Sequence, residues 1–222
     1  MTPPPVAEPP ALRLLHVPSR VRAAVLLLPG GRAESLRPPT RLDLPSRRMV
    51  PFGRAVCRDL PGDVLLTALV RYRYRGWNGP RADPVRDARR ALGELAALAP
   101  HLAVTLVGHS MGGRAALAVA GHPRVRGVVA LAPWCVPGDP VRQLADRNLV
   151  VLHDPRDRTT SAAQSFAFAR RAAGIGARVQ TLPMRHGGHA MVRDAATWHR
   201  FTADAVASVL TGVPLLPQRP ED

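Results

Sequence analysis

Short apolar runs of strand-like length recur along the chain, and longer stretches of helical periodicity separate the later ones. The runs are continuous rather than alternating, which is typical of strands buried on both faces of a sheet. They occupy residues 12–17, 21–28, 64–70, 104–107, 125–131, 149–152 and 178–182. Apolar residues spaced three and four apart predict helices over residues 84–98, 112–120, 160–173 and 194–210.

This alternation predicts an α/β fold, with a mostly parallel sheet of about 6–8 strands and helices on both faces, because right-handed crossovers lay helices over a sheet. The sequence contains no internal repeat and no interior linker, so residues 11–213 are expected to form one domain. Residues 1–10 are proline-rich, and residues 214–222 are polar and interrupted by proline. We expect both segments to be flexible tails.

Composition narrows the class of protein. With 222 residues, 46% hydrophobic and 21% charged, the chain can bury a core, which excludes wholesale disorder and collagen-like architecture. Its longest apolar runs, such as Ala23–Leu28, are far shorter than the ~20 residues of a membrane-spanning helix. The N-terminal residues contain five prolines instead of the basic and apolar segments of a signal peptide. We therefore expect a cytoplasmic protein that does not associate with membranes.

The net charge of +15 comes from 31 basic residues, all of which are arginine. Such a charge attracts nucleic acid at low salt, but these arginines occur in ones and twos rather than in a block. A solvated surface is the favoured interpretation, with no specific nucleic-acid partner. The two cysteines, Cys57 and Cys135, form neither a metal-ligand cluster nor a disulfide framework, and the oligomeric state stays open.

One strand end carries a distinctive motif. Residues 103–113 read AVTLVGHSMGG, a strand followed by G-x-S-x-G and then by a helical segment. In this context the glycines allow strand and helix to approach closely, and Ser110 is exposed on a strained turn as a nucleophile. The strand-to-helix setting makes the motif much more specific than the five-residue pattern alone.

The GHSMGG segment resembles the nucleophile elbow of the α/β-hydrolase superfamily, and further segments match in the order of that superfamily. The resemblance implies a single-domain α/β-hydrolase fold and a Ser-His-Asp triad in the order Ser110, Asp157, His189. It also implies an acyl-enzyme mechanism that needs no metal and no organic cofactor. The superfamily commonly opens with an antiparallel hairpin, whereas residues 11–28 leave room for little more than one strand before the oxyanion strand.

The acid and the base are identified by similar segments. Residues 149–158, LVVLHDPRDR, resemble the H-G-x-x-D segment and place the acid at Asp157, although Asp154 replaces the expected glycine and remains a rival. Residues 183–192, PMRHGGHAMV, resemble the glycine-rich loop that carries the base. His189 is the candidate, and His186 is the alternative.

Residues 25–32, VLLLPGGR, resemble the strand end that supplies an oxyanion-hole amide, with Pro29 where many members have histidine. The amide of Gly31 or of Arg32 is expected to act together with that of Met111. A plain Pro-Gly-Gly turn is the competing interpretation of this segment.

The resemblance also bears on the substrate. Residues 132–148 are too few for a cap domain, so we expect an open site for a small-molecule acyl substrate. His109 and Trp134 are candidate pocket residues, as is Trp77 in the basic glycine-bearing loop RYRYRGWNGP.

Three functional hypotheses follow. The first is a serine hydrolase that cleaves an ester, thioester or related acyl bond. The second is an acyltransferase or perhydrolase that uses the same triad. The third is a non-catalytic binding protein on the same scaffold.

Overall fold

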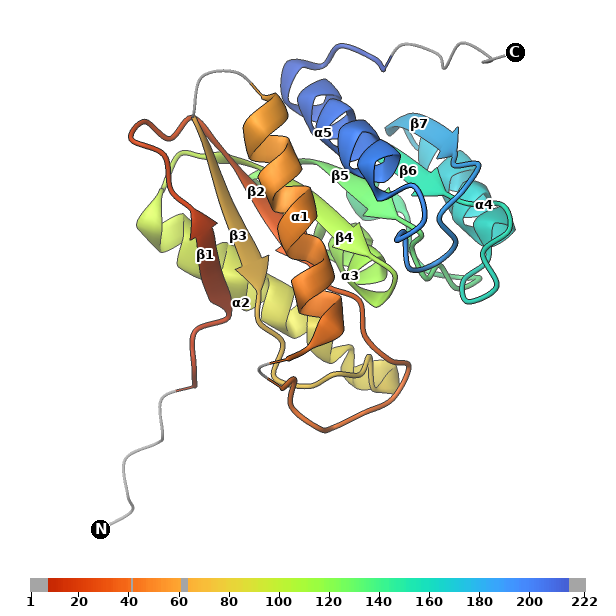
Figure 1. Ribbon diagram of the computed structural model, residues 1–222, viewed down its shortest axis with the longest axis horizontal. Helices are drawn as coiled ribbons and strands as arrows, with labels where there is room; N and C mark the ends of the chain where they lie inside the picture. The colour runs from red at the N-terminus through yellow and green to blue at the C-terminus, as the bar shows by residue number, and fades with distance from the viewer. Residues whose placement is uncertain (1–7, 41, 61–63, 216–222) are drawn as a thin grey trace.

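A computed structural model describes residues 8–40, 42–60 and 64–215, and its seven strands form one sheet in the order β1-β3-β2-β4-β5-β6-β7 (Figure 1). β1 is antiparallel to β3, and all other neighbouring strands are parallel. The predicted α/β fold with a mostly parallel sheet is therefore confirmed. The strands are β1 (Leu12–His16), β2 (Ala23–Leu28), β3 (Leu65–Val70), β4 (Ala103–His109), β5 (Val125–Leu131), β6 (Asn148–His153) and β7 (Arg178–Pro183).

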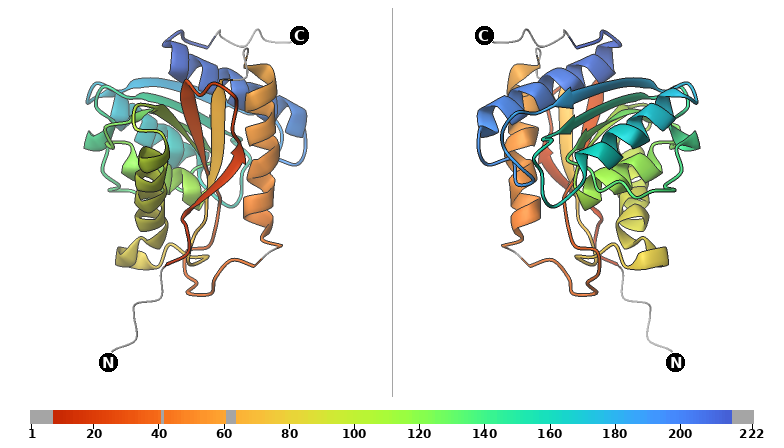
Figure 2. Two further views of the ribbon diagram at one scale, coloured as in Figure 1. Left: turned by 90° about the vertical axis from the view of Figure 1, so that its left-hand side faces the viewer. Right: turned by 90° about the vertical axis from the view of Figure 1, so that its right-hand side faces the viewer.

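Helices cover both faces of the sheet, as the crossover rule predicts (Figures 1 and 2). On one face α1 (Leu44–Asp59) packs beside α5 (Ala195–Thr211), and Phe52 and Trp198 are buried beneath them. On the other face lie α2 (Asp83–Leu98), α3 (Met111–Val119) and α4 (Ala162–Ala173). The strands are thus buried on both sides, which explains their continuous apolar sequences.

The helix α1 is absent from the sequence prediction. Its interior contains Pro51 and Gly53, two residues that disfavour an isolated helix. Met49, Phe52 and Val56 nevertheless form a buried face against the sheet. Tertiary burial therefore stabilises a helix that local propensity does not indicate.

The carboxyl ends of the central strands are aligned. Leu28 of β2 lies opposite Gly108 of β4, and His109 lies opposite Leu131 of β5. Loops that follow these strands therefore meet at one edge of the sheet, where ligand sites of open α/β sheets are found.

The connection between β5 and β6 is short, as predicted. Within it, the 3₁₀ turn η2 (Arg142–Leu144) is the one helical element, so no cap domain is inserted at this point. Across the residues that the structure describes, no helix is both long and apolar enough to span a bilayer. Parts of the two predicted tails, residues 1–7 and 216–222, lie outside the described residues.

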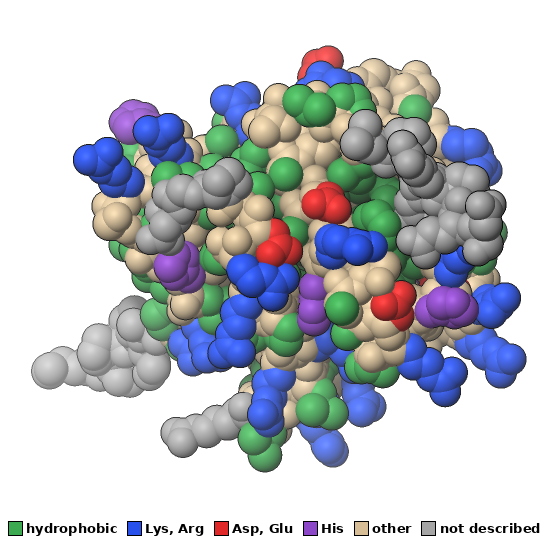
Figure 3. All heavy atoms as spheres, turned by 45° about the horizontal axis from the view of Figure 1, so that its top comes forward, with side chains coloured by type: hydrophobic (Ala, Val, Ile, Leu, Met, Phe, Trp, Pro, Cys, Tyr) green, Lys and Arg blue, Asp and Glu red, His purple; other side chains and the backbone are tan. Residues whose placement is uncertain are grey.

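Arginine side chains are spread over the molecule. On the face shown in Figure 3 they stand among acidic, neutral and apolar side chains and form no single block. This distribution agrees with the scattered arginines of the sequence.

Candidate active site

Ser110 occupies a sharp turn between β4 and α3. Its φ of 55° and ψ of −118° are rare for a residue with a side chain, so the turn is strained. The flanking glycines make this turn possible. A Cβ atom on Gly108 would collide with the carbonyl oxygen of Gly112, and a Cβ atom on Gly112 would collide with that of Leu28. The backbone at the motif thus has the geometry that G-x-S-x-G predicts.

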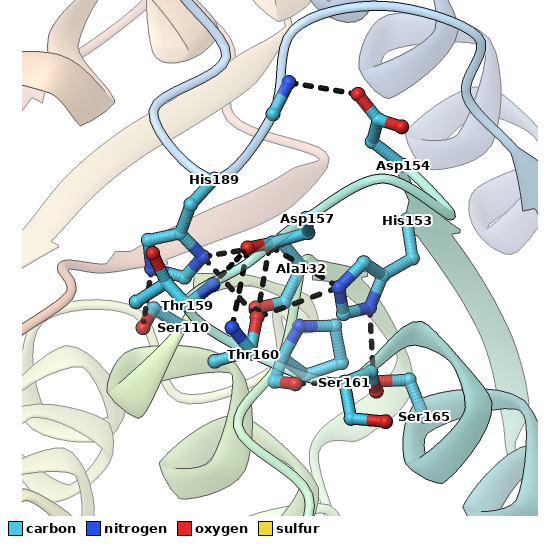
Figure 4. A network of polar contacts seen from close by, with 12 residues as sticks. Ser110, Ala132, His153, Asp154, Asp157, Thr159, Thr160, Ser161, Ser165 and His189 are labelled. Atoms are coloured by element: carbon cyan, nitrogen blue, oxygen red, sulfur yellow. Dashed lines mark hydrogen bonds and ion pairs between the residues drawn. The ribbon is translucent and has the colours of Figure 1, made fainter.

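Three side chains from different loops meet at this turn (Figure 4). The Ser110 Oγ atom lies 3.0 Å from His189 Nε2, and His189 Nδ1 lies 2.8 Å from Asp157 Oδ2. A carboxylate only accepts hydrogen bonds, so Nδ1 carries the imidazole proton and Nε2 is left to accept from the serine hydroxyl. The arrangement can therefore move a proton from Ser110 to His189.

The carboxylate of Asp157 is the most buried member of this chain of contacts. Ser110 is 8% exposed, whereas the Asp157 side chain is fully buried. Burial alone would raise the pKa of Asp157, but the Thr159 amide and the His189 imidazole outweigh it and hold that pKa below its usual value. Asp157 is therefore ionised at neutral pH and can stabilise a positive charge on the imidazole.

Several further donors surround the Asp157 carboxylate (Figure 4). Its Oδ1 atom accepts from the backbone amides of Thr159 at 2.7 Å and Thr160 at 3.2 Å. Its Oδ2 atom accepts from the Thr160 hydroxyl at 3.0 Å and lies 3.2 Å from His153 Nε2. Both oxygens are thus held on several sides, which fixes the carboxylate for its contact with His189.

His153 is a second, fully buried histidine on the same carboxylate. Its Nδ1 atom lies 3.0 Å from the Ser165 hydroxyl, which is also within reach of the Pro133 carbonyl. Desolvation lowers the pKa of His153, so its ring is neutral at pH 7. A proton on Nε2 donates to Asp157 and leaves Nδ1 to accept from Ser165.

The structure separates the roles of the two rival acids. Asp154 points away from the imidazole (Figure 4) and accepts from the backbone amide of Gly188 at 2.8 Å and from that of Arg156 at 2.8 Å. Asp154 therefore holds the loop that carries His189 through the Gly188 amide, whereas Asp157 contacts the His189 imidazole itself.

The two rival histidines are likewise distinct. His186 is exposed, and its backbone carbonyl accepts from Trp198 Nε1 at 2.6 Å. The next residue, Gly187, has a φ of 126°, and a Cβ there would collide with the Trp198 ring. His186 thus lies where the loop is anchored to α5, and His189 lies where the loop reaches Ser110.

His109 is buried beside the His189 imidazole. It is 2% exposed, its Nε2 atom donates to the His189 carbonyl at 2.9 Å, and its ring lies 4.9 Å from the His189 ring. Desolvation lowers the pKa of His109 to about 3, so the ring is neutral. The prediction of His109 as a substrate-pocket residue is corrected accordingly, because the side chain faces His189 from inside the protein.

The candidate oxyanion amides differ in their availability. The Arg32 amide donates to the Arg75 carbonyl at 2.8 Å, so it is not directed at a substrate. The prediction of Arg32 as an oxyanion-hole residue is therefore wrong. A Cβ on Gly31 would collide with the side chain of Met111, so these two residues are in close contact beside Ser110. Met111 is the first residue of α3, so its amide has no partner within the helix. Gly31 and Met111 remain the candidate pair.

Trp77 and Trp134 enclose an arginine. The guanidinium of Arg114 lies 4.1 Å from the Trp77 ring centre and 4.7 Å from that of Trp134, and it forms a bidentate pair with Asp139. The Trp134 amide donates to the Ser110 carbonyl at 3.0 Å. Both aromatic residues thus support the helix that follows Ser110, and their contact with substrate stays a prediction.

The contacts that sequence reasoning missed come from the end of β6, the turn that follows it and the first part of α4. Thr160 and Ser165 carry no motif signal, because their function depends on hydrogen bonds within the folded turn. His153 matched the H-G-x-x-D segment, but its contact with Asp157 was not predicted. Over the described part of the chain, no group of three or more His, Cys, Asp or Glu residues is arranged to hold a metal ion.

Comparisons with known proteins agree with this fold. The model of the serine aminopeptidase, S33 family matches residues 73–207, more than half of the chain. A search of curated proteins finds no match. Among solved structures, an α/β serine hydrolase homologue from Coxiella burnetii is similar at 14% identity with a TM-score of 0.66, over 86% of this chain and 89% of that chain.

Two further solved structures show the same likeness. MGS-M1, an α/β hydrolase from a Medee basin deep-sea metagenome library, is 19% identical with a TM-score of 0.65, over 86% of each chain. Est1E from Butyrivibrio proteoclasticus, solved with ferulic acid bound, is 11% identical with a TM-score of 0.64, over 90% of this chain and 96% of that chain. At these identities the structures establish the fold, and the family match establishes membership. The chain therefore belongs to the serine aminopeptidase, S33 family within the α/β-hydrolase superfamily.

Proposed function

We propose that this hydrolase cleaves an ester, thioester or related acyl bond of a small molecule, with Ser110 as nucleophile, His189 as general base and Asp157 as the orienting acid. The observation that carries the proposal is the continuous contact from Ser110 Oγ through His189 to Asp157, with separations of 3.0 and 2.8 Å. Distances of this size meet the requirement for nucleophile and base.

In the first half of the reaction, His189 Nε2 takes the Ser110 proton while Oγ bonds to the carbonyl carbon of the substrate. The carbonyl oxygen gains the negative charge, and the amides of Gly31 and Met111 stabilise it. Collapse of this tetrahedral species breaks the acyl bond. The leaving group departs with the proton from His189, and the acyl group stays on Ser110.

In the second half, a water molecule gives a proton to His189 Nε2 and attacks the acyl carbon. The Ser110–acyl bond then breaks, Oγ recovers the proton, and a carboxylic acid is released. Throughout, Asp157 stays ionised and stabilises the imidazolium that forms twice in each cycle.

The site favours a neutral or anionic acyl compound over a substrate with an ammonium group. A carboxylate is a common partner of a substrate ammonium, and three carboxylates near the site already have partners within the protein. Asp154 accepts from two backbone amides, Asp157 holds His189, and Asp139 pairs with Arg114. The net charge of +15 acts in the same direction. The similar Est1E structure contains ferulic acid, a carboxylic acid, which agrees with acyl chemistry.

The proposal is tested by labelling the purified protein with a fluorophosphonate probe, with peptide mapping of the adduct. We expect one adduct on Ser110, none in Ser110→Ala, and strongly slowed labelling in His189→Ala. Ser208→Ala is the matched control, because Ser208 lies on α5 and bonds to Gln180. Folded wild-type protein that stays unlabelled contradicts the mechanism and favours a binding role.

A second measurement defines the bond that is cleaved. Nitrophenyl esters of increasing acyl length are compared with the corresponding aminoacyl nitroanilides, using the labelled protein as the inactive reference. We expect turnover of the esters with transient acylation of Ser110. Preferential turnover of the aminoacyl substrates contradicts the proposed substrate class while leaving the nucleophile unchanged.

A further inference from the structure

A groove lies between α2 and α3, which pack side by side on the face of the sheet that they share with α4 (Figure 2). Its volume of about 390 Å³ is toward the lower end of the ~300–1,000 Å³ typical of small-molecule sites. The described residues that line the groove do not include Ser110, Asp157 or His189. The groove therefore contains no residue of the proposed triad, and Trp77 is the one candidate pocket residue that lines it.

Helical spacing explains how the groove is formed. On α2 the residues Val85, Arg86 and Arg89 face it, and on α3 the residues Arg114, Leu117 and Ala118 face it. Positions three and four apart lie on the same side of a helix, so each helix presents one row of side chains to the space between them.

The base of the groove is apolar and aromatic. Trp77 is 9% exposed, and Leu117 and Phe168 are buried, so these side chains offer a limited apolar surface rather than an open hydrophobic patch. Trp77 is held rigidly, because its ring stacks on the Arg114 guanidinium. A flat aromatic body suits such a surface.

The rim of the groove carries positive charge that the protein does not neutralise. Arg81 pairs with Asp83, and Arg114 pairs with Asp139. Arg86 and Arg89 are exposed, and among the described residues neither has a carboxylate partner. Two like charges three residues apart on a helix repel each other, and an anion placed between them relieves that repulsion.

From the apolar base and the two unpaired guanidinium groups we infer that this groove is a second ligand site, which binds an aromatic carboxylate. The ring lies against Trp77 and Phe168, and the carboxylate meets Arg86 and Arg89. The inference does not rest on the proposed hydrolase mechanism, because it uses none of Ser110, Asp157 and His189. It assigns Trp77, a candidate residue of the substrate pocket in the sequence analysis, to the second site instead.

The inference is tested by isothermal titration calorimetry with naphthoate, using naphthamide as the neutral probe of the same shape. Physiological ionic strength screens general attraction to the basic protein. We expect naphthoate to bind and naphthamide to bind at least about tenfold more weakly, because charge-assisted hydrogen bonds are lost. The double variant Arg86→Gln/Arg89→Gln is expected to weaken naphthoate binding by a similar factor.

Two further variants separate the groove from other surfaces. Arg54→Gln removes one exposed arginine from α1, which lies on the opposite face of the sheet from α2, and is expected to leave binding within about twofold. Ala118→Trp fills the groove and is expected to abolish binding of naphthoate, with folding checked by thermal unfolding. Equal binding of naphthoate and naphthamide overturns the inference, as does undiminished binding in the double variant or no binding by the wild type.

Discussion

Two regions flank Ser110 and are built in opposite ways. On one side, the turn at residues 153–165 surrounds Asp157 with side-chain and backbone donors. On the other side, the end of β2 at residues 29–32 approaches Ser110 with backbone alone. In the proposed mechanism, the first region acts through the chemical identity of its side chains, and the second acts through the absence of a side chain at Gly31.

This difference determines how each region responds to substitution. In the acid region, a change of functional group alters the chemistry even when the shape is preserved. In the β2 region, the candidate functional group is the backbone amide of Gly31, and every residue except proline has such an amide. A substitution there is therefore expected to alter activity only by changing the shape of the backbone. Four substitutions or conditions test this contrast.

The largest effect is expected from Asp157→Asn. Both oxygens of Asp157 accept hydrogen bonds, so the new amide group faces either the Thr159 and Thr160 amides or the imidazole. In the first orientation the NH₂ group of the new asparagine faces two backbone N–H donors, so neither can form its hydrogen bond. In the second, the NH₂ group donates to His189 Nδ1, so the imidazole proton moves to Nε2 and that atom can no longer accept from Ser110. We expect kcat/KM for a nitrophenyl ester to fall by about 10³–10⁴-fold.

Asp154→Asn is the matched control for that variant, since it makes the same chemical change three residues away. Asp154 holds Gly188 and contacts no imidazole, so we expect a loss of about tenfold through looser placement of the His189 loop. Equal losses in the two variants contradict the separate roles of the two carboxylates.

The same contrast explains how much of the molecule is predictable from sequence. Buried strands such as β4 and β5 are continuous apolar runs, and Ser110, Asp157 and His189 lie in segments whose residue types and order are restricted by chemistry. These features were predicted. Helix α1 was not predicted, because Pro51 and Gly53 lower the helix propensity of a segment whose helix is stabilised by tertiary packing.

The missed parts of the site have a related cause. Thr160 contacts Asp157, and Ser165 contacts His153, only once the chain is folded. Threonine and serine are common residues, so neither position carries a recognisable sequence motif. The choice between Gly31 and Arg32 depends on the Arg75 carbonyl, which lies more than forty residues away in the chain. Long-range backbone hydrogen bonds of this kind have no local sequence signal.

The second-largest effect is expected from Gly31→Ala, which tests the region built from backbone. The added methyl group collides with the Met111 side chain and with the Arg75 carbonyl. Because the collision with the Arg75 carbonyl displaces the backbone at Gly31, and with it the candidate oxyanion amide, we expect kcat to fall by about 10²-fold with a smaller change in KM. Gly93→Ala is the control. Gly93 lies within α2 with no atom near its Cβ position, so that variant is expected to keep full activity.

The third effect concerns stability and pH. Because the pKa of His109 is about 3 in the folded protein and 6.5 when unfolded, only the unfolded chain binds this proton between those values. The stabilisation that comes from neutral His109 is therefore fully present above about pH 6.5. It is lost as the pH falls below that value, by about 1.4 kcal/mol per pH unit.

Urea unfolding at pH 7 and pH 5 measures this contribution. His109→Gln keeps a donor for the His189 carbonyl but cannot titrate. We expect the wild type to lose about 2 kcal/mol more than this variant between the two pH values. The two proteins differ at residue 109 alone, so contributions that both share cancel in the comparison. Equal losses would show that His109 is protonated in the folded protein.

The smallest effect is expected at His153, which contacts the proposed triad at Asp157. His153→Leu removes the buried donor 3.2 Å from the Asp157 carboxylate and leaves the Ser165 hydroxyl without its ring partner. We expect kcat to fall by about tenfold with KM unchanged, because the imidazole is held less firmly in the transition state while substrate contacts persist. His153→Gln restores an amide donor of similar reach and is expected to recover most of the loss. A purely structural role for His153 predicts instead that both variants lower the unfolding temperature and leave kcat of the folded fraction intact, so thermal unfolding measured beside kcat separates the two explanations.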